Sequence, residues 1–149
     1  MKYLTVLAAA LGLASAGAIP LEERDVQTVQ LTFYAGPTSY TMSIPADGTT
    51  HPTNQNNLNV NIIGSTNYDI FRLCKFNYKP PASGTVTLVG SVSSNENQVL
   101  VGPPAPIISV SCQGFCVPIY SDCYRNGQFV GLCCNGYCAA NKCRPWTPF

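Results

Sequence analysis

Charged side chains are scarce in this sequence. Asp, Glu, Lys and Arg make up 10% of its 149 residues, against about 25% in a typical soluble domain. The basic and acidic side chains nearly balance, which leaves a formal net charge of +1. A surface that neutralises nucleic-acid phosphates needs clustered Lys and Arg, so we expect no nucleic-acid partner.

Catalytic signatures are missing as well. The one histidine, His51, lies in a polar loop beside Pro52, where a solvated side chain is the simplest interpretation. The sequence has no nucleophile elbow, no glycine-rich phosphate loop and no Asn-x-Ser/Thr sequon. The carboxylates of Asp47, Asp69 and Glu96 stand far apart and are most simply turn residues. We therefore expect no enzymatic activity and no cofactor.

The longest apolar run lies at the N-terminus. Residues 1–18 place Lys2 before an apolar stretch and end in small residues, which is the pattern of a secretory signal peptide. The stretch is shorter than the ~20 residues that span a bilayer. Residues 19–24 are either a short pro-segment, cut after Arg24, or the start of the mature chain. We expect a secreted, extracellular product without membrane insertion.

Cysteine is absent from the first 73 residues and concentrated near the C-terminus. Seven of the eight cysteines fall between Cys112 and Cys143. Eight cysteines behind a signal peptide indicate four disulfides in an oxidising compartment. Zinc is the weaker explanation, because the cluster contains no histidine and the adjacent Cys133 and Cys134 do not suit a tetrahedral site. We expect no bound metal.

Residues 25–113 read as short strands separated by turns. Polar and apolar residues alternate over 26–35 and 39–44, and Leu58, Val60 and Ile62 alternate with asparagines, which is the period of half-buried strands. Further strands are predicted at 70–78, 85–92, 99–101 and 107–112, with turns at 36–37, 93–97 and 102–106. The pattern predicts an all-β fold, a small antiparallel β-sandwich or β-barrel.

Residues 114–149 form a second, cysteine-rich module that is too short to order itself around a core. From Cys116, the gaps between successive cysteines hold six, nine, no, three and four residues. This spacing resembles the inhibitor cystine knot, or knottin. The resemblance implies the bridges Cys116–Cys134, Cys123–Cys138 and Cys133–Cys143. Cys74 and Cys112 then staple two strands of the β region; alternatively, Cys74 bridges into the knot segment, and Cys112 and Cys116 exchange roles.

The loop between the second and third cysteines of the knot is the best candidate for a binding surface. It presents Tyr124, Arg125, Asn126 and Phe129 around an Asn-Gly turn, and Trp146 adds an aromatic side chain to the module. Aromatic residues and arginine are enriched in interaction hot spots, and a rigid loop loses little entropy on binding. The alternative is that these rings pack the knot against the β region, and for Trp146 both interpretations stay open.

The signal peptide, the segment VQLTFYAGPTSYTMSIPADG, the strand LNVNII and the cysteine-rich tail resemble the small secreted cysteine-rich proteins of filamentous fungi. In particular, they resemble the hypersensitive-response-inducing elicitors, which act outside plant cells. The resemblance implies a virulence effector or elicitor that contacts a host extracellular or cell-surface protein and triggers defence or cell death. It transfers no functional residues to this chain.

Two other functions compete with this hypothesis. The first is a knottin-type protease inhibitor or toxin that acts through the 124–132 loop. The second is a cell-wall carbohydrate-binding protein in which exposed aromatic side chains such as Trp146 stack on sugar rings.

Overall fold

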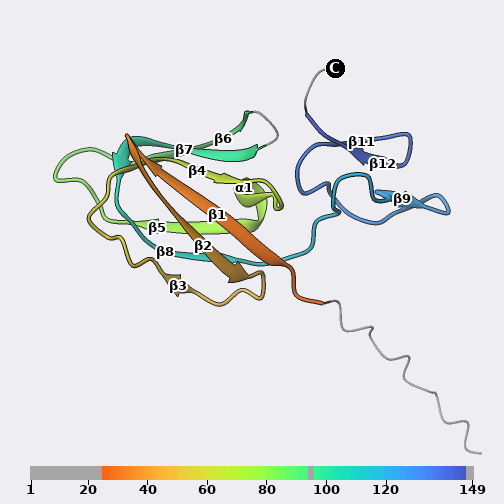
Figure 1. Ribbon diagram of the computed structural model, residues 1–149, viewed down its shortest axis with the longest axis horizontal. Coiled ribbons are helices and arrows are strands. Elements are labelled where there is room, and N and C mark those ends of the chain that lie inside the picture. The colour runs from red at the N-terminus through yellow and green to blue at the C-terminus, as the bar shows by residue number, and fades with distance from the viewer. Residues whose placement is uncertain (1–24, 94–95, 147–149) are drawn as a thin grey trace, which may run out of the picture.

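The computed structural model describes residues 25–93 and 96–146 of the chain. The predicted signal peptide at 1–18 and the segment 19–24 lie outside these residues. The regular secondary structure of the described chain is almost entirely β-strand, and two facing antiparallel sheets are followed by a small C-terminal module (Figure 1). In this part of the molecule, no helix has the length and apolar character required to cross a bilayer.

The larger sheet has five antiparallel strands in the order β2-β1-β4-β7-β6. Its strands are β1 (Thr28–Ala35), β2 (Thr38–Pro45), β4 (Val60–Ser65), β6 (Thr87–Ser93) and β7 (Glu96–Ala105). Strands β1 and β2 are joined by the predicted turn at Gly36 and Pro37. Gly36 adopts a φ of 65° there, a conformation that costs glycine little.

The smaller sheet has three strands in the order β3-β8-β5. They are β3 (His51–Pro52), β5 (Cys74–Tyr78) and β8 (Ile107–Cys112), and both pairings are antiparallel. Only Pro106 separates the end of β7 from the start of β8. The chain therefore passes from the larger sheet to the smaller one at this residue.

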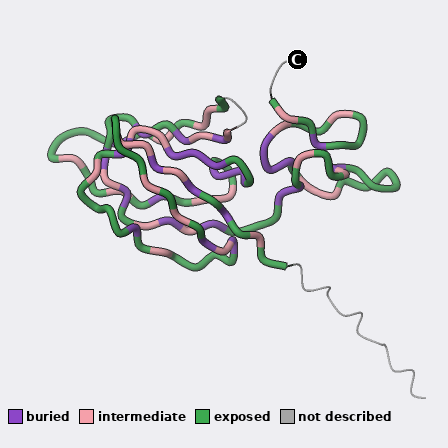
Figure 2. The backbone as a smooth tube through the Cα atoms, in the orientation of Figure 1, coloured by how far each residue is buried: buried purple, intermediate pink, exposed green. Residues whose placement is uncertain are grey.

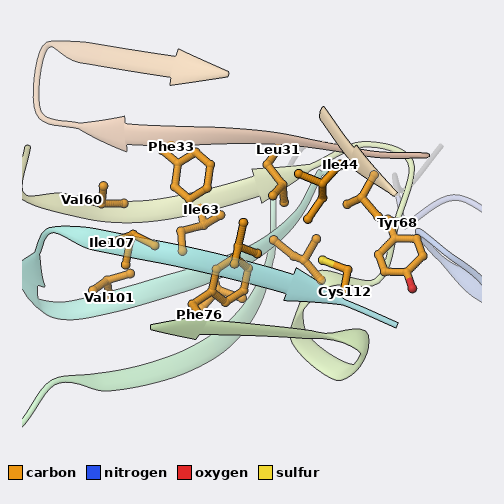
Figure 3. Packing of buried hydrophobic residues seen from close by; sticks show 14 of the residues in the cluster. Leu31, Phe33, Ile44, Val60, Ile63, Tyr68, Phe76, Val101, Ile107 and Cys112 are labelled. Atoms are coloured by element: carbon orange, nitrogen blue, oxygen red, sulfur yellow. The ribbon is translucent and has the colours of Figure 1, made fainter. Parts of the chain in front are cut away.

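The two sheets face each other across one hydrophobic core (Figure 3). From β1, Leu31 and Phe33 point into it, as the period of two along a strand predicts. Phe76 from β5 and Ile107 from β8 meet them from the other sheet. The larger sheet keeps two edge strands, β2 and β6, so the fold is an open sandwich and not a closed barrel.

The prediction of a strand over 70–78 is wrong for the first half of this range. Residues Ile70–Leu73 form α1, a single helical turn, and strand β5 begins only at Cys74. Asp69 is the N-cap, and its carboxylate accepts a hydrogen bond from the backbone N–H of Arg72 at 3.3 Å. Aspartate is a preferred N-cap because it satisfies an N–H that the helix itself leaves unpaired.

Two other strand predictions need correction. The register of β4 shifts between Val60 and Ile62, as a β-bulge does, so Val60 and Ile63 are buried in the core whereas Ile62 is only half-buried. Strand β7 begins at Glu96 and ends at Ala105. It therefore includes most of the residues that the glycine and prolines at 102–106 predict as a turn.

All eight cysteines lie among the described residues, and all are paired. The bridges are Cys74–Cys112, Cys116–Cys134, Cys123–Cys138 and Cys133–Cys143. The first joins partner positions of β5 and β8, so the exchange of Cys112 with Cys116 does not occur. The other three are the pairs that the knottin resemblance implies, and the segment that they close carries two hairpins, β9 (Tyr124–Arg125) with β10 (Gln128–Phe129) and β11 (Tyr137–Ala139) with β12 (Lys142–Arg144).

The cysteine-rich module is anchored to the sandwich through the backbone of one disulfide. The Gln27 side chain accepts a hydrogen bond from the N–H of Cys116 at 2.9 Å and donates one to its carbonyl at 2.8 Å. The Asn97 amide donates to the carbonyl of Cys134 at 3.2 Å. Because both cysteines are also part of the main hydrophobic core, the Cys116–Cys134 bridge belongs to both regions.

Candidate functional site

The candidate binding loop is a β-hairpin. Tyr124 on β9 and Phe129 on β10 are direct cross-strand partners, and their ring centroids lie 5.2 Å apart with an angle of 57° between the planes. The connecting residues Asn126 and Gly127 have φ values of 53° and 75°. Two positive φ values in a two-residue turn are the requirement of type I′ geometry, for which Asn-Gly is the preferred sequence. The type I′ turn and the cross-strand ring pair therefore both stabilise the hairpin conformation.

The aromatic pair and the arginine of this hairpin face solvent. Tyr124 is 41% exposed and Phe129 is 54% exposed, and the side chain of Arg125 is 70% exposed. The hairpin projects from the side of the module away from the sandwich, and both its strands are exposed (Figures 1 and 2). The rings pack on each other, so the interpretation that they attach the knot to the β region does not apply to Tyr124 and Phe129.

Asp122 ties the hairpin to the neighbouring strand β12. Its carboxylate lies 2.6 Å from the ammonium of Lys142 and 3.8 Å from Nε of Arg125. The hydrogen bond from Lys142, together with the charge of Lys142, lowers the pKa of Asp122 below its usual value. The guanidinium of Arg125 is therefore oriented from one side while most of its surface stays accessible.

Trp146 belongs to a different cluster from the hairpin. Its ring packs against Tyr137 at a centroid distance of 5.6 Å and an angle of 43°. It also lines a cleft of about 170 Å³ together with Phe71 and Arg72 of the sandwich. Ligand sites usually exceed about 300 Å³, so this cleft is too small for a small-molecule site. The structure does not unite Trp146 with Tyr124, Arg125, Asn126 and Phe129 in a single surface.

Three sulfur atoms meet in the interior of the knot. The Sγ atoms of Cys123, Cys133 and Cys143 lie within 4.8 Å of one another. Each of these sulfurs is bonded in a disulfide. Cysteine binds zinc as a thiolate, which a bridged cysteine does not supply.

His51, expected in a loop, is the first residue of β3, and a short hydrogen-bonded chain joins it to Asp47. The Thr49 hydroxyl donates to Asp47 at 2.6 Å and lies 2.7 Å from Nε2 of His51. Hydrogen bonds from the side chain and backbone of Thr49 lower the pKa of Asp47. In a catalytic triad, the histidine takes the hydroxyl proton, whereas here the proton points to the carboxylate. This geometry is that of a turn, as expected for Asp47.

The residues that dock the two regions carry no signal in the sequence. Gln27 and its partner Cys116 are 89 positions apart, and Asn97 and its partner Cys134 are 37 positions apart. Neither pairing is visible in a local pattern of polarity.

Glu96, expected as a turn residue, lies instead on β7.

No known family model matches the chain, and neither does a curated protein or a solved structure. The resemblance to fungal elicitors therefore stays a prediction from the segments quoted above. The functional argument rests on geometry, and the exposed β9-β10 hairpin is its strongest element.

Proposed function

We propose that this protein is a secreted, non-enzymatic effector or elicitor that binds a host extracellular component and triggers plant defence or cell death. The observation that carries the proposal is the exposed Tyr124–Phe129 pair beside Arg125 on the β9-β10 hairpin. The four disulfides support an extracellular location, because such bridges persist in oxidising compartments.

The hairpin is suited to protein recognition for an energetic reason. Large aromatic side chains and arginine dominate interaction hot spots. The strand preceding the turn starts directly after Cys123, which is bridged to Cys138, so the base of the hairpin is covalently tied. A pre-organised loop avoids most of the ordering cost that a flexible loop incurs on binding.

The backbone of the hairpin supports a knottin-type protease inhibitor less well. A protease binds its substrate as an extended strand, and an inhibitor that imitates substrate needs an extended loop. The tip of this hairpin has positive φ at Asn126 and Gly127, which is far from the extended region. We therefore assign the hairpin to recognition of a host protein and treat protease inhibition as an outcome of the test.

The test compares oxidised, refolded protein with hairpin variants in infiltrated leaves. We expect the wild type to cause cell death, measured as ion leakage over a dilution series, and reduction of the disulfides to abolish it. The double variant Tyr124→Ala/Phe129→Ala should need at least about tenfold more protein, since losing a hot-spot pair costs upwards of 1.4 kcal/mol.

The matched control is Tyr137→Ala. Tyr137 is 45% exposed, similar to Tyr124, but its ring packs against Trp146 outside the hairpin. Its removal should leave the dose response unchanged. An inert oxidised wild type, or a double variant as active as the wild type, would overturn the proposal. Inhibition of a secreted protease by the wild type and not by the double variant would replace it.

A further inference from the structure

The outer face of the larger sheet carries an open hollow with a mixed polar and apolar lining, which the hairpin does not touch. It opens on the side opposite the hydrophobic core, because Tyr34 and Gln98 alternate with the buried Phe33 and Val99 along β1 and β7. Strand β4 runs between these two strands. Side chains from three strands therefore surround one hollow.

Glu96 lies across the floor of this hollow. Its carboxylate accepts a hydrogen bond from the Tyr34 hydroxyl at 3.1 Å and one from the Gln98 amide at 2.8 Å. Burial, and then the nearby charge of Glu96, raise the pKa of Tyr34, so its hydroxyl keeps the proton that it donates. The two bonds reach different carboxylate oxygens and fix the group in one orientation.

Gly64 makes this arrangement possible. It lies between Thr32 of β1 and Gln98 of β7 in the sheet register, directly under the carboxylate of Glu96. A Cβ atom at position 64 would collide with that carboxylate. The missing side chain thus creates the depression into which Glu96 folds.

The hollow is shallow and open to solvent, and it is large enough to hold part of an extended ligand. Its volume is about 580 Å³, within the roughly 300–1,000 Å³ of small-molecule sites. The side chains that shape it combine one ring, one aliphatic group and several planar or hydroxylic polar groups: Tyr34, Asn61, Ile62, Thr66, Glu96 and Gln98. The Asn61 side-chain oxygen accepts a hydrogen bond from the N–H of Gly36 at 3.4 Å, which orients its amide.

We propose that this outer face binds a neutral oligosaccharide. Sugar hydroxyls both donate and accept hydrogen bonds, and the carboxylate and amides of the hollow offer acceptors and donors side by side. The Tyr34 ring and the Ile62 side chain supply apolar surface for the C–H face of a pyranose. Hydrogen bonds to a carboxylate are stronger than those to neutral acceptors, so Glu96 is the central contact.

The charge of the lining selects against other ligands. Glu96 is the one ionisable carboxylate among the described lining residues, and no lysine or arginine is among them. A divalent cation such as Ca²⁺ needs six to eight oxygen ligands, more than one carboxylate provides. An acidic sugar would meet repulsion from Glu96 with no compensating cation. The site is therefore expected to reject uronic-acid polymers.

The experiment is a titration of ¹⁵N-labelled mature protein monitored by amide chemical shifts. The probes are cellohexaose, xylohexaose, laminarihexaose and chitohexaose, with an oligogalacturonide as the acidic comparison. We expect at least one neutral probe to shift amides of β1, β4 and β7 at concentrations up to about 10 mM, the range of weak ligands. The oligogalacturonide should shift none of them.

Three substitutions test the assignment. Glu96→Gln and Tyr34→Phe should each weaken binding about tenfold, since a charge-assisted hydrogen bond contributes about that factor. Gly64→Ala should do the same by displacing the carboxylate without removing any polar group. Thr41→Ala is the control, because Thr41 lies on the outer side of β2 opposite Thr32 and outside the hollow. Amide dispersion in each spectrum establishes that the variant is folded.

The proposal is overturned if no neutral probe shifts these strands, if the oligogalacturonide binds equally well, or if Glu96→Gln binds like the wild type. This outcome is separate from that of the leaf assay. Loss of glycan binding with intact cell death would leave the hairpin proposal standing, and loss of cell death in the hairpin variant would leave the glycan site standing.

Discussion

The sandwich and the knot are held together by different forces. In the sandwich, side chains from two sheets form a continuous core, whereas the second, smaller cluster in the knot consists of Val117, Cys123, Cys133 and Cys143, with Val130 packed against it. Three of the four buried residues in that smaller cluster are disulfide-bonded cysteines. The sandwich therefore depends on burial of apolar surface and the knot on covalent links. Short segments in general need disulfides or other cross-links, because they cannot bury enough apolar surface.

This difference in stabilisation affects where aromatic side chains can lie in the two regions. A segment stabilised by bridges does not need its aromatic side chains in a core, so Tyr124 and Phe129 stay on the surface. In the sandwich, the aromatic ring of Phe33 is fully buried and stacks on Tyr40 at 4.6 Å. The knot can thus leave aromatic side chains on its surface without losing stability.

The largest expected effect is the loss of a core ring. Phe33→Ala should lower the free energy of unfolding by about 3–5 kcal/mol, because it removes a fully buried side chain and leaves a cavity. Urea denaturation followed by far-UV circular dichroism measures this change. Val89→Ala is the control, since Val89 is 51% exposed, and it should change stability by less than about 0.5 kcal/mol. A loss below about 1 kcal/mol for Phe33→Ala would contradict the comparison.

Removing a disulfide tests whether the knot depends on covalent links. Cys133→Ser/Cys143→Ser opens a loop with a sequence separation of 10, which should cost the knot about 3 kcal/mol in the chain-entropy model. The expected result is faster tryptic cleavage after Arg125, while the urea midpoint of the sandwich stays close to that of the wild type.

The matched variant is Cys74→Ser/Cys112→Ser. This bridge joins β5 and β8 within the sandwich, so its loss should lower the sandwich midpoint and leave cleavage at Arg125 slow. If both double variants behaved alike, the two regions would unfold as one cooperative unit and the comparison would fail.

Removing the hydrogen bonds between the two regions should have a smaller effect on stability. Gln27→Ala leaves the N–H and carbonyl of Cys116 without their side-chain partner, which should cost about 1–3 kcal/mol. Hydrogen exchange at the Cys116 amide should accelerate, and ¹⁵N relaxation should report faster independent motion of the knot. Gln55→Ala, in an exposed loop, is the control and should change neither. Unchanged exchange in Gln27→Ala would show that the core contacts and the Asn97–Cys134 hydrogen bond hold the knot without Gln27.

The smallest expected effect concerns pH, and it has opposite signs in the two regions. Lys142 lowers the pKa of Asp122 in the knot, so this carboxylate stabilises the fold above its unfolded pKa of about 3.9. That stability is lost as the pH falls through the lower folded value. Burial raises the pKa of Asp69 in the sandwich, so its contribution is present at low pH and is lost as the pH rises through the higher folded value.

Carboxyl titration by NMR measures both groups directly. The Asp122 resonance should titrate below the usual range for aspartate and the Asp69 resonance above it. Lys142→Ala should return Asp122 toward its ordinary pKa, because it removes the principal cause of the shift, and should leave Asp69 unchanged. Titration of both carboxyls in the same direction would contradict this contrast between the regions.

Local patterns predicted much of the fold correctly. The alternation around Leu31 and Phe33 predicted their burial, and the Asn126-Gly127 pair predicted a turn, which the structure shows to be the turn of a hairpin. The predictions failed where a local sequence pattern was compatible with two different local structures. Ile70–Leu73 has the composition of a strand, but an aspartate N-cap and burial of Ile70 favour a helical turn, and the bulge in β4 moved burial from Ile62 to Ile63.

The candidate sites divide in the same way. The candidate loop was visible in the sequence because its aromatic residues, its turn and the flanking cysteines are contiguous, whereas its hairpin form came from the structure. The hollow around Glu96 was not, because Tyr34, Gly64 and Glu96 come from three strands that meet only through sheet pairing. For Trp146 the sequence left binding and packing open, and the structure places its ring against Tyr137 and in the cleft that Phe71 and Arg72 of the sandwich also line.

The sequence by itself determined the all-β class, the division into a cysteine-poor and a cysteine-rich region, and the position of the Asn126-Gly127 turn, because each depends on composition or on neighbours along the chain. Only the tertiary structure decided that the sheets form an open sandwich, that Gln27 and Asn97 dock the knot, and that Glu96 lies over Gly64. These contacts join residues tens of positions apart, and their formation depends on the register and packing of whole sheets.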